Sequence, residues 1–113
     1  MVLQQVELVV SGGQEAAFEA ALCEVRQRVF ASPGFRGFTV VERLHDHPVS
    51  YLVQVRWETA DELTAHLDTR FERCWSPVEP FLAGTPRVGH FRERPGFDLN
   101  GPGVITDLSW LTS

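Results

Sequence analysis

Apolar and polar residues alternate along four short stretches of the chain, which is the spacing of half-buried β-strands. Gly, Pro and Ser residues interrupt the alternation, and a polar turn that contains Pro joins the second stretch to the third. The pattern predicts four strands, at residues 2–10, 35–44, 50–58 and 87–93. Within the first and third strands the alternation assigns one common face to Val6, Leu8, Val53, Val55 and Trp57.

Two longer stretches have the apolar spacing of amphipathic helices. They predict one helix at residues 14–30 and a second at residues 59–75, followed by a short helical turn that Pro77 begins. Thr59, with Glu62 three residues later, has the pattern of a capping box at the start of the second helix. The apolar stripe of this second helix is expected to consist of Leu63, Leu67, Phe71 and Cys74.

The resulting order, β-α-β-β-α-β, predicts an α+β fold of the ferredoxin-like type with a four-stranded antiparallel sheet. Both helices should cover the same face of the sheet, because each has a single apolar stripe. The opposite face is half apolar and carries Leu3, Val9 and Leu52. A homodimer with the two sheets facing each other would bury this face. Glu7 and Arg56 also lie on it and are expected to form an ion pair there.

With 113 residues the chain is expected to form one domain. Residues 1–93 hold all the predicted elements, and residues 94–113 form a tail with an apolar end. We expect this tail to pack on the domain or across the dimer, with Trp110 as its anchor.

The charge balance and the apolar pattern narrow the classes of partner. Ten Arg, no Lys and fifteen carboxylates give a net charge of −5, which lacks the basic stripe of a nucleic-acid binder. Anionic membranes are disfavoured for the same reason. The apolar runs are far shorter than the roughly 20 residues of a membrane span. The first ten residues lack a signal-peptide pattern. A cytoplasmic domain without nucleic-acid or membrane partners is the expectation.

Three side chains are candidates for chemistry. His66 borders the predicted apolar stripe, and a histidine with a pKa near its usual value of about 6.5 can accept a phenolic proton at neutral pH. The alternative is a histidine at the edge of the stripe with one nitrogen in solvent. Trp57 and Trp75 could stack on a flat substrate, or they could be ordinary core residues. The spacing of His and Cys residues predicts no metal site.

Five segments of the chain stand in the order seen in antibiotic biosynthesis monooxygenase (ABM) domains, and the sequence resembles that family over residues 2–93. The third strand ends in Trp57-Glu58 as in the family. The five segments are GQEAAF (residues 13–18), SPGFRGF (32–38), YLVQVRWE (51–58), FERCW (71–75) and VEPFL (78–82). The resemblance implies a dimeric α+β barrel.

The family includes cofactor-independent oxygenases that convert anthrone-type phenols to quinones, quinol oxidases, haem-degrading enzymes and proteins without known activity. The resemblance therefore implies a cofactor-independent monooxygenase or oxidase that acts on a bulky phenol, quinol or polyketide-like aromatic. His66 would be the base and Trp57 the platform for the substrate. The alternative is a non-catalytic barrel that binds a hydrophobic small molecule or has a stress or regulatory role. Haem binding is a third possibility.

Compared with the family residue by residue, Trp57 matches the Trp of the substrate pocket. In the anthrone oxygenases an Asn and a Tyr assist the phenol, and here Val53 and Leu63 stand at those positions. In the haem-degrading members a Trp and a His lie on the second helix, and here those positions hold His66 and Ser76. We expect Trp57 to border a cavity between sheet and helices and His66 to reach it. The other expected lining residues are Val6, Leu8, Val53, Val55, Leu63 and Trp75.

Overall fold

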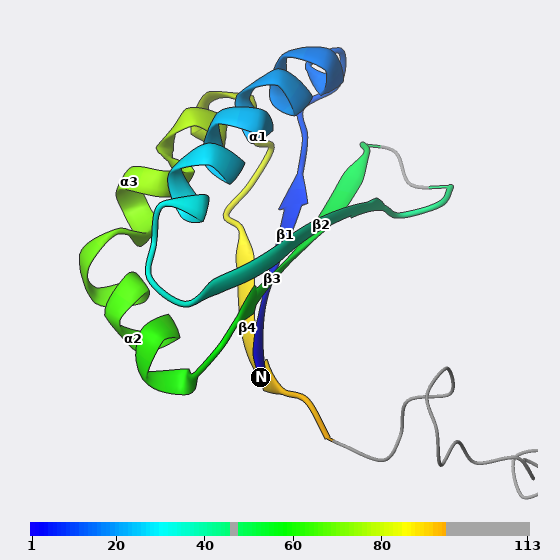
Figure 1. The fold of residues 1–113 in the computed structure, drawn as a ribbon. Helices are drawn as coiled ribbons and strands as arrows, with labels where there is room; N and C mark the ends of the chain where they lie inside the picture. Colours follow the sequence, from blue (N-terminus) through cyan, green and yellow to red (C-terminus); the bar gives the residue numbers. More distant parts are fainter. Residues whose placement is uncertain (46–47, 95–113) are drawn as a thin grey trace, which may run out of the picture.

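Figure 1 presents the chain as a computed structural model, which describes residues 1–45 and 48–94. The expected packing of the tail concerns residues that, apart from Arg94, lie outside this described part. None of the described helices is long and apolar enough to cross a membrane. In chain order the elements are β1 (Val2–Val9), α1 (Glu15–Phe30), β2 (Phe35–Glu42), β3 (Ser50–Trp57), α2 (Ala60–Thr69), α3 (Phe71–Trp75), the 3₁₀ helix η1 (Ser76–Phe81) and β4 (Arg87–Arg92).

The four strands form one antiparallel sheet in the order β2-β3-β1-β4. All helices lie on one side of it (Figure 1), so the predicted ferredoxin-like α+β fold is confirmed. In the register of the two central strands, Val6 lies opposite Val53 and Val2 opposite Trp57. These side chains are buried beneath the helices. The common face predicted from alternation is therefore correct.

The core lies between this face and α1. The helix buries Phe18, Leu22, Val25 and Val29, which recur every three or four residues and form a single stripe against the sheet. Each large apolar side chain removed from water contributes about 1.5–3 kcal/mol. This stripe therefore supplies much of the attraction between the helical layer and the strands. Tyr51 of β3 packs on Phe18 with ring centroids 4.8 Å apart.

The second helix is broken, contrary to the prediction of one helix from Thr59 to Trp75. At Arg70 the backbone leaves the helical region, with φ −132° and ψ −14°, and α2 ends while α3 begins. The break turns the following residues about the helix axis. Leu63 and Cys74 of the predicted stripe are buried, as are His66 and Trp75, whereas Leu67 and Phe71 of the stripe are only half-buried.

The start of α2 is fixed by its predicted cap and by the turn before β2. The Thr59 hydroxyl accepts a hydrogen bond from the Glu62 N–H at 3.2 Å and donates one to the Glu62 carboxylate at 3.1 Å. Gly34, in the turn, has φ +85°, and a Cβ added there would lie 2.7 Å from the Glu62 Cβ. The turn therefore requires glycine for both its backbone angle and its contact with α2.

The predicted ion pair between Glu7 and Arg56 is absent from the face of the sheet that the helices leave open. Glu7 pairs with Arg43 at 3.1 Å, and Arg56 pairs with Glu93. The register explains the difference, since Arg56 lies opposite Leu3, four residues along β1 from Glu7. The prediction had the correct face and the wrong partners.

Candidate functional site

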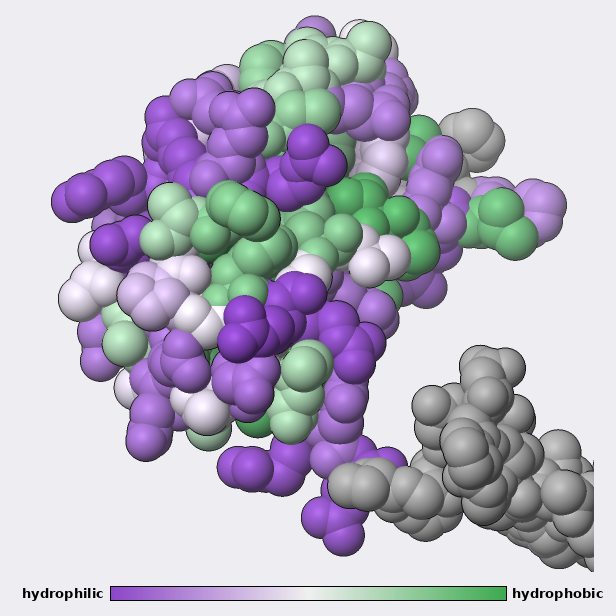
Figure 2. Space-filling view, viewed as in Figure 1, coloured by the Kyte–Doolittle hydropathy of each residue, from purple (hydrophilic) through white to green (hydrophobic). Residues whose placement is uncertain are grey.

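A cavity of about 470 Å³ lies between the sheet and the short helices that follow α2. Its floor is formed by Val6 and Leu8 of β1, and its walls by α3, η1 and the loop that leads to β4. Apolar side chains gather between the helices and the sheet in Figure 2, with hydrophilic side chains around them. The cavity is lined by Val6, Leu8, Phe71, Glu72, Trp75, Val78, Glu79, Leu82, Ala83, Gly84, Thr85 and Pro86.

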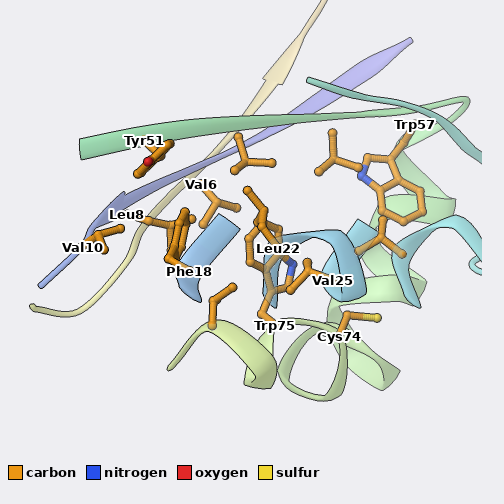
Figure 3. Close-up of a cluster of buried hydrophobic side chains, with 14 of the residues drawn as sticks. Val6, Leu8, Val10, Phe18, Leu22, Val25, Tyr51, Trp57, Cys74 and Trp75 are labelled. Carbon is orange, nitrogen blue, oxygen red and sulfur yellow. The ribbon is translucent and has the colours of Figure 1, made fainter. Parts of the chain in front are cut away.

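Two aromatic rings give the cavity a flat wall. Trp75 extends from α3 toward the strands in Figure 3, and its ring centroid lies 6.1 Å from that of Phe71. Phe38 of β2 stacks on Trp75 at 6.4 Å with an angle of 25° between the planes. The indole ring therefore packs on two aromatic neighbours and is nearly fully buried, which restricts its rotation. A flat apolar molecule in the cavity would meet a wall that is already ordered.

His66 lies behind this wall. Its ring packs on Trp57 with centroids 4.6 Å apart and meets Phe71 edge-on at 6.4 Å. Its Nδ1 is hydrogen-bonded to the Ser32 hydroxyl at 3.0 Å, while its Nε2 is buried without a hydrogen-bond partner in the described part of the chain. The side chain is 2% exposed. His66 is thus an enclosed imidazole rather than a histidine at the edge of the stripe with one nitrogen in solvent.

Burial and, to a smaller extent, the charge of Arg70 together lower the pKa of His66 to about 4. Removing an imidazolium from water costs free energy, so the neutral ring is favoured. His66 is therefore neutral at physiological pH and has an open lone pair or N–H at Nε2. A proton acceptor with this pKa is available over a wide pH range, but it is weaker than an exposed histidine.

Gln4 is a buried polar residue that the sequence analysis missed. Its side chain is 0% exposed, and neither the amide nitrogen nor the amide oxygen has a partner among the described residues. It lies on β1 two residues before Val6, on the same helix-covered face. The indole N–H groups of Trp57 and Trp75 are also buried without partners. A buried polar group without a hydrogen bond costs about 1–3 kcal/mol, so such groups are candidates for contacts with a ligand or water.

The alternation of β1 contained the signal for Gln4, because residue 4 has the same parity as Val6 and Leu8. The predicted inner face of this strand began at Val6 and did not extend back to residue 4. A polar residue at an inner position of a central strand is the feature that would have identified it.

Some of the predicted site residues line the cavity, and the others lie elsewhere in the fold. Val6, Leu8 and Trp75 line the cavity. Trp57 is fully buried against His66 and Phe35 and is not part of the lining, so the cavity expected beside Trp57 lies beside Trp75 instead. Val53 and Val55 are buried in the core, and Leu63 faces a different hollow next to Val2.

No group of three or more His, Cys, Asp or Glu side chains that could hold a metal ion occurs in residues 1–45 and 48–94. The polar side chains of the lining are Glu72, Glu79 and Thr85, together with Trp75, whose indole N–H is buried without a partner in the described part of the chain. The arrangement can enclose a bulky apolar molecule, orient it against Trp75 and keep water from most of its surface.

Several solved structures share the fold. A candidate antibiotic biosynthesis monooxygenase from Bordetella bronchiseptica is 25% identical, with a TM-score of 0.69 over 82% of this chain and 97% of that one. SnoaB, a cofactor-independent oxygenase from Streptomyces nogalater, is 21% identical, with a TM-score of 0.69 over 82% of this chain and 92% of its own. MhuD, with two manganese protoporphyrin IX molecules bound per active site, is 20% identical, with a TM-score of 0.66 over 82% and 94%.

Identities this low establish likeness of fold, not of substrate. Among curated proteins, none matches the sequence significantly. The sequence profile of antibiotic biosynthesis monooxygenases matches residues 1–77, which is more than half of the chain and includes β1 to α3. Because the matched residues make up more than half of the chain and include three of the four strands, the chain belongs to the antibiotic biosynthesis monooxygenase family.

Proposed function

We propose that the chain is a cofactor-independent oxygenase that binds a bulky phenol, quinol or polyketide-like aromatic in the cavity beside Trp75. The observation that carries the proposal is the cavity itself, an apolar space of about 470 Å³ with an ordered aromatic wall in a chain of this family. Ligand pockets commonly have volumes of roughly 300–1,000 Å³ and a mostly apolar lining with few polar groups. The cavity meets both conditions.

The reaction that suits such a site is oxidation of an activated methylene group or phenol ring by dioxygen. A base removes a proton, the resulting carbanion reacts with O₂, one oxygen atom enters the product as a carbonyl, and the other leaves as water. The site's contribution is a dry pocket, a fixed orientation of the ring and a proton acceptor. No metal is part of this proposal.

We assign the role of proton acceptor to His66, which is neutral at physiological pH because of its lowered pKa. Phe71 contacts His66 and also lines the cavity. A rotation of the Phe71 ring would therefore open the imidazole to a bound substrate. Trp57, packed against the other side of the imidazole, would support its orientation rather than carry the substrate.

The proposal is tested by oxygen uptake against a panel of anthrones, phenols and quinols. We expect the unmodified chain to consume O₂ with at least one of them. His66→Gln, which keeps a polar side chain of similar size, should reduce the rate by about 10²-fold or more, the usual contribution of a general base. His90→Ala, which changes an exposed histidine on β4, is the matched control and should leave the rate unchanged. Equal rates for all three proteins would refute the role of His66.

A second candidate function is a non-catalytic protein that binds a hydrophobic small molecule. The enclosure of His66 favours it, since the imidazole is 2% exposed and its burial makes it a weak base. Val53 and Leu63, at the positions where the anthrone oxygenases have polar groups, also favour it. Tight binding of aromatic ligands without O₂ uptake in the same panel would select this function over the oxygenase.

A further inference from the structure

The rim of the cavity carries negative charge from two separate elements. Glu72 belongs to α3 and Glu79 to η1, and both line the cavity. Both side chains are exposed, and within residues 1–45 and 48–94 no ion pair involves either of them. Neither carboxylate is therefore held in a direct ion pair with a described residue, whereas the charges of Arg28, Arg70 and Arg73 act on Cys74 of the same helix as Glu72.

The lining of the cavity contains no Arg and no His. The chain has no Lys, so its fixed positive charges come from ten arginines and the N-terminus. Residues 95–113 include two Asp and no Arg, Lys or His. Whatever position that segment takes, it brings no positive side chain to the cavity.

The aromatic wall, like the two carboxylates, favours a ligand that carries a positive charge. Trp75 and Phe71 line the cavity, and aromatic rings attract cations through their faces. A positive group on a ligand would find attraction from the rings and from the rim. A negative group would find no partner and two like charges.

We propose that the cavity selects aromatic ligands that carry a positively charged amine, and that Glu72 and Glu79 set this selectivity. The inference rests on the proposed function, because it takes the cavity as the substrate site. It narrows the substrate class to aromatic amines and neutral aromatics and excludes polyanionic ring systems.

The test uses three anthracene probes of nearly equal shape: 9-(aminomethyl)anthracene, 9-(hydroxymethyl)anthracene and 9-anthracenecarboxylate. Their binding to the full chain is followed by quenching of tryptophan fluorescence at low and high salt. We expect the amine to bind about 3- to 10-fold more tightly than the alcohol, and the carboxylate to bind more weakly than both. High salt should reduce these differences, because the carboxylates are exposed.

Glu72→Gln and Glu79→Gln should each reduce the advantage of the amine by about 2- to 5-fold and leave the alcohol unaffected. Asp61→Asn, which removes one carboxylate from the first turn of α2, is the matched control for net charge and should change none of the three affinities.

The outcomes separate the two proposals. Equal affinities for the three probes, or tighter binding of the carboxylate probe, overturn the selectivity. In either case, binding of the alcohol still supports the cavity as a site for aromatic ligands. If none of the probes binds, the proposed function fails and the selectivity fails with it. If a variant with both Glu72→Gln and Glu79→Gln still prefers the amine, the two carboxylates do not cause the preference, and the proposed selectivity is overturned.

Discussion

Ser32 and His66 form a polar pair inside an otherwise apolar region. The serine follows the C-terminus of α1, and its hydroxyl contacts the Nδ1 of His66 on α2 at 3.0 Å. Both side chains are buried. The hydrogen bond joins the segment after α1 to α2 across 34 positions of the chain, and it holds the imidazole in place through one nitrogen.

Replacing Ser32 by Ala should destabilise the fold by about 1–3 kcal/mol, because Nδ1 of His66 would be left buried without a partner. The free energy of unfolding can be measured by urea denaturation. Ser76→Ala removes an exposed hydroxyl that bonds to the Arg73 carbonyl, and its effect should stay within about 0.5 kcal/mol. If Ser32→Ala and Ser76→Ala lowered the free energy of unfolding equally, the result would contradict the burial of the Ser32–His66 hydrogen bond.

The lowered pKa of His66 predicts a loss of stability in mild acid. In the unfolded chain the imidazole takes up a proton near its usual pKa of 6.5, whereas in the fold it stays neutral until about pH 4. Between these values the unfolded state binds more protons, so stability falls as the pH falls. The loss should approach roughly 3 kcal/mol at pH 4. In His66→Gln, denaturation between pH 7 and pH 4 should show a correspondingly shallower decline.

Sequence alone predicted which side chains face the helices, but not which of them are enclosed. Strand alternation assigned Trp57 to the inner face, helical spacing placed His66 at the edge of the apolar stripe, and both are buried. Their mutual packing depends on the turn of α2 relative to β3, which no local pattern records. For the site, this means that the cavity lies beside Trp75, whereas side chains such as Phe35 and His66 pack around Trp57.

Among the secondary-structure elements, the turn between α1 and β2 has the strictest requirements. Gly34 adopts φ +85°, and its carbonyl accepts a hydrogen bond from the Glu58 N–H at 2.8 Å, which links the turn to the end of β3. Glu62 of α2 fills the space where a side chain would stand. The turn therefore connects three elements through one residue without a side chain.

Gly34→Ala should destabilise the fold by about 2 kcal/mol or more, since a left-handed backbone costs about 1–2 kcal/mol for alanine and Glu62 must also shift. Gly12→Ala is the matched control, because no atom lies within 4 Å of a Cβ added there. Its effect on the melting temperature should be small. A Gly34→Ala protein as stable as Gly12→Ala would show that the turn can relax.

The break at Arg70 marks the limit of prediction for the helices. The spacing of Leu63, Leu67, Phe71 and Cys74 fits one continuous helix, and helix propensity offers no Pro or Gly at residue 70 to interrupt it. The break follows from tertiary packing, which buries His66 and Trp75 on the inner side. The cap at Thr59 depends only on residues close in sequence, and it was therefore predicted correctly.

For the molecule as a whole, the face of the sheet that the helices leave open remains half apolar. Val41 is 46% exposed and Phe91 50%, and Leu3, Val9 and Leu52 lie on the same face, partly buried. A second copy with its sheet turned toward this face would cover these side chains and the ion pairs among them. We therefore expect a homodimer, as the sequence predicted.

Val41→Glu should weaken self-association by about 10-fold or more, because it places a charge among the apolar side chains of the expected interface. Val40→Glu is the matched control. Val40 is the preceding residue of β2, is 40% exposed and points to the helix side, opposite Val53. Sedimentation velocity at several concentrations distinguishes the two variants. A stable monomer at micromolar concentration for the unmodified chain would refute the dimer.

The two walls of the cavity differ in how much structure supports each of them. One wall is β1, held on both sides by neighbouring strands, and the other consists of α3 and η1, with five and six residues. Helices this short have almost no stability of their own. They are retained by packing on α1 and by the Arg28 guanidinium, which donates a hydrogen bond to the Arg73 carbonyl at 2.6 Å.

We expect this asymmetry to let the helical wall open on its own, at a rate that differs from that of the sheet. Amide protons of residues 71–81 should exchange with solvent well before those of β1 and β3, because local opening of the wall does not require the sheet to separate. A ligand that enters by this route cannot bind faster than the wall opens. Its association rate should therefore level off at high ligand concentration, at a value shared by ligands of different chemistry, and Arg28→Ala should raise that plateau.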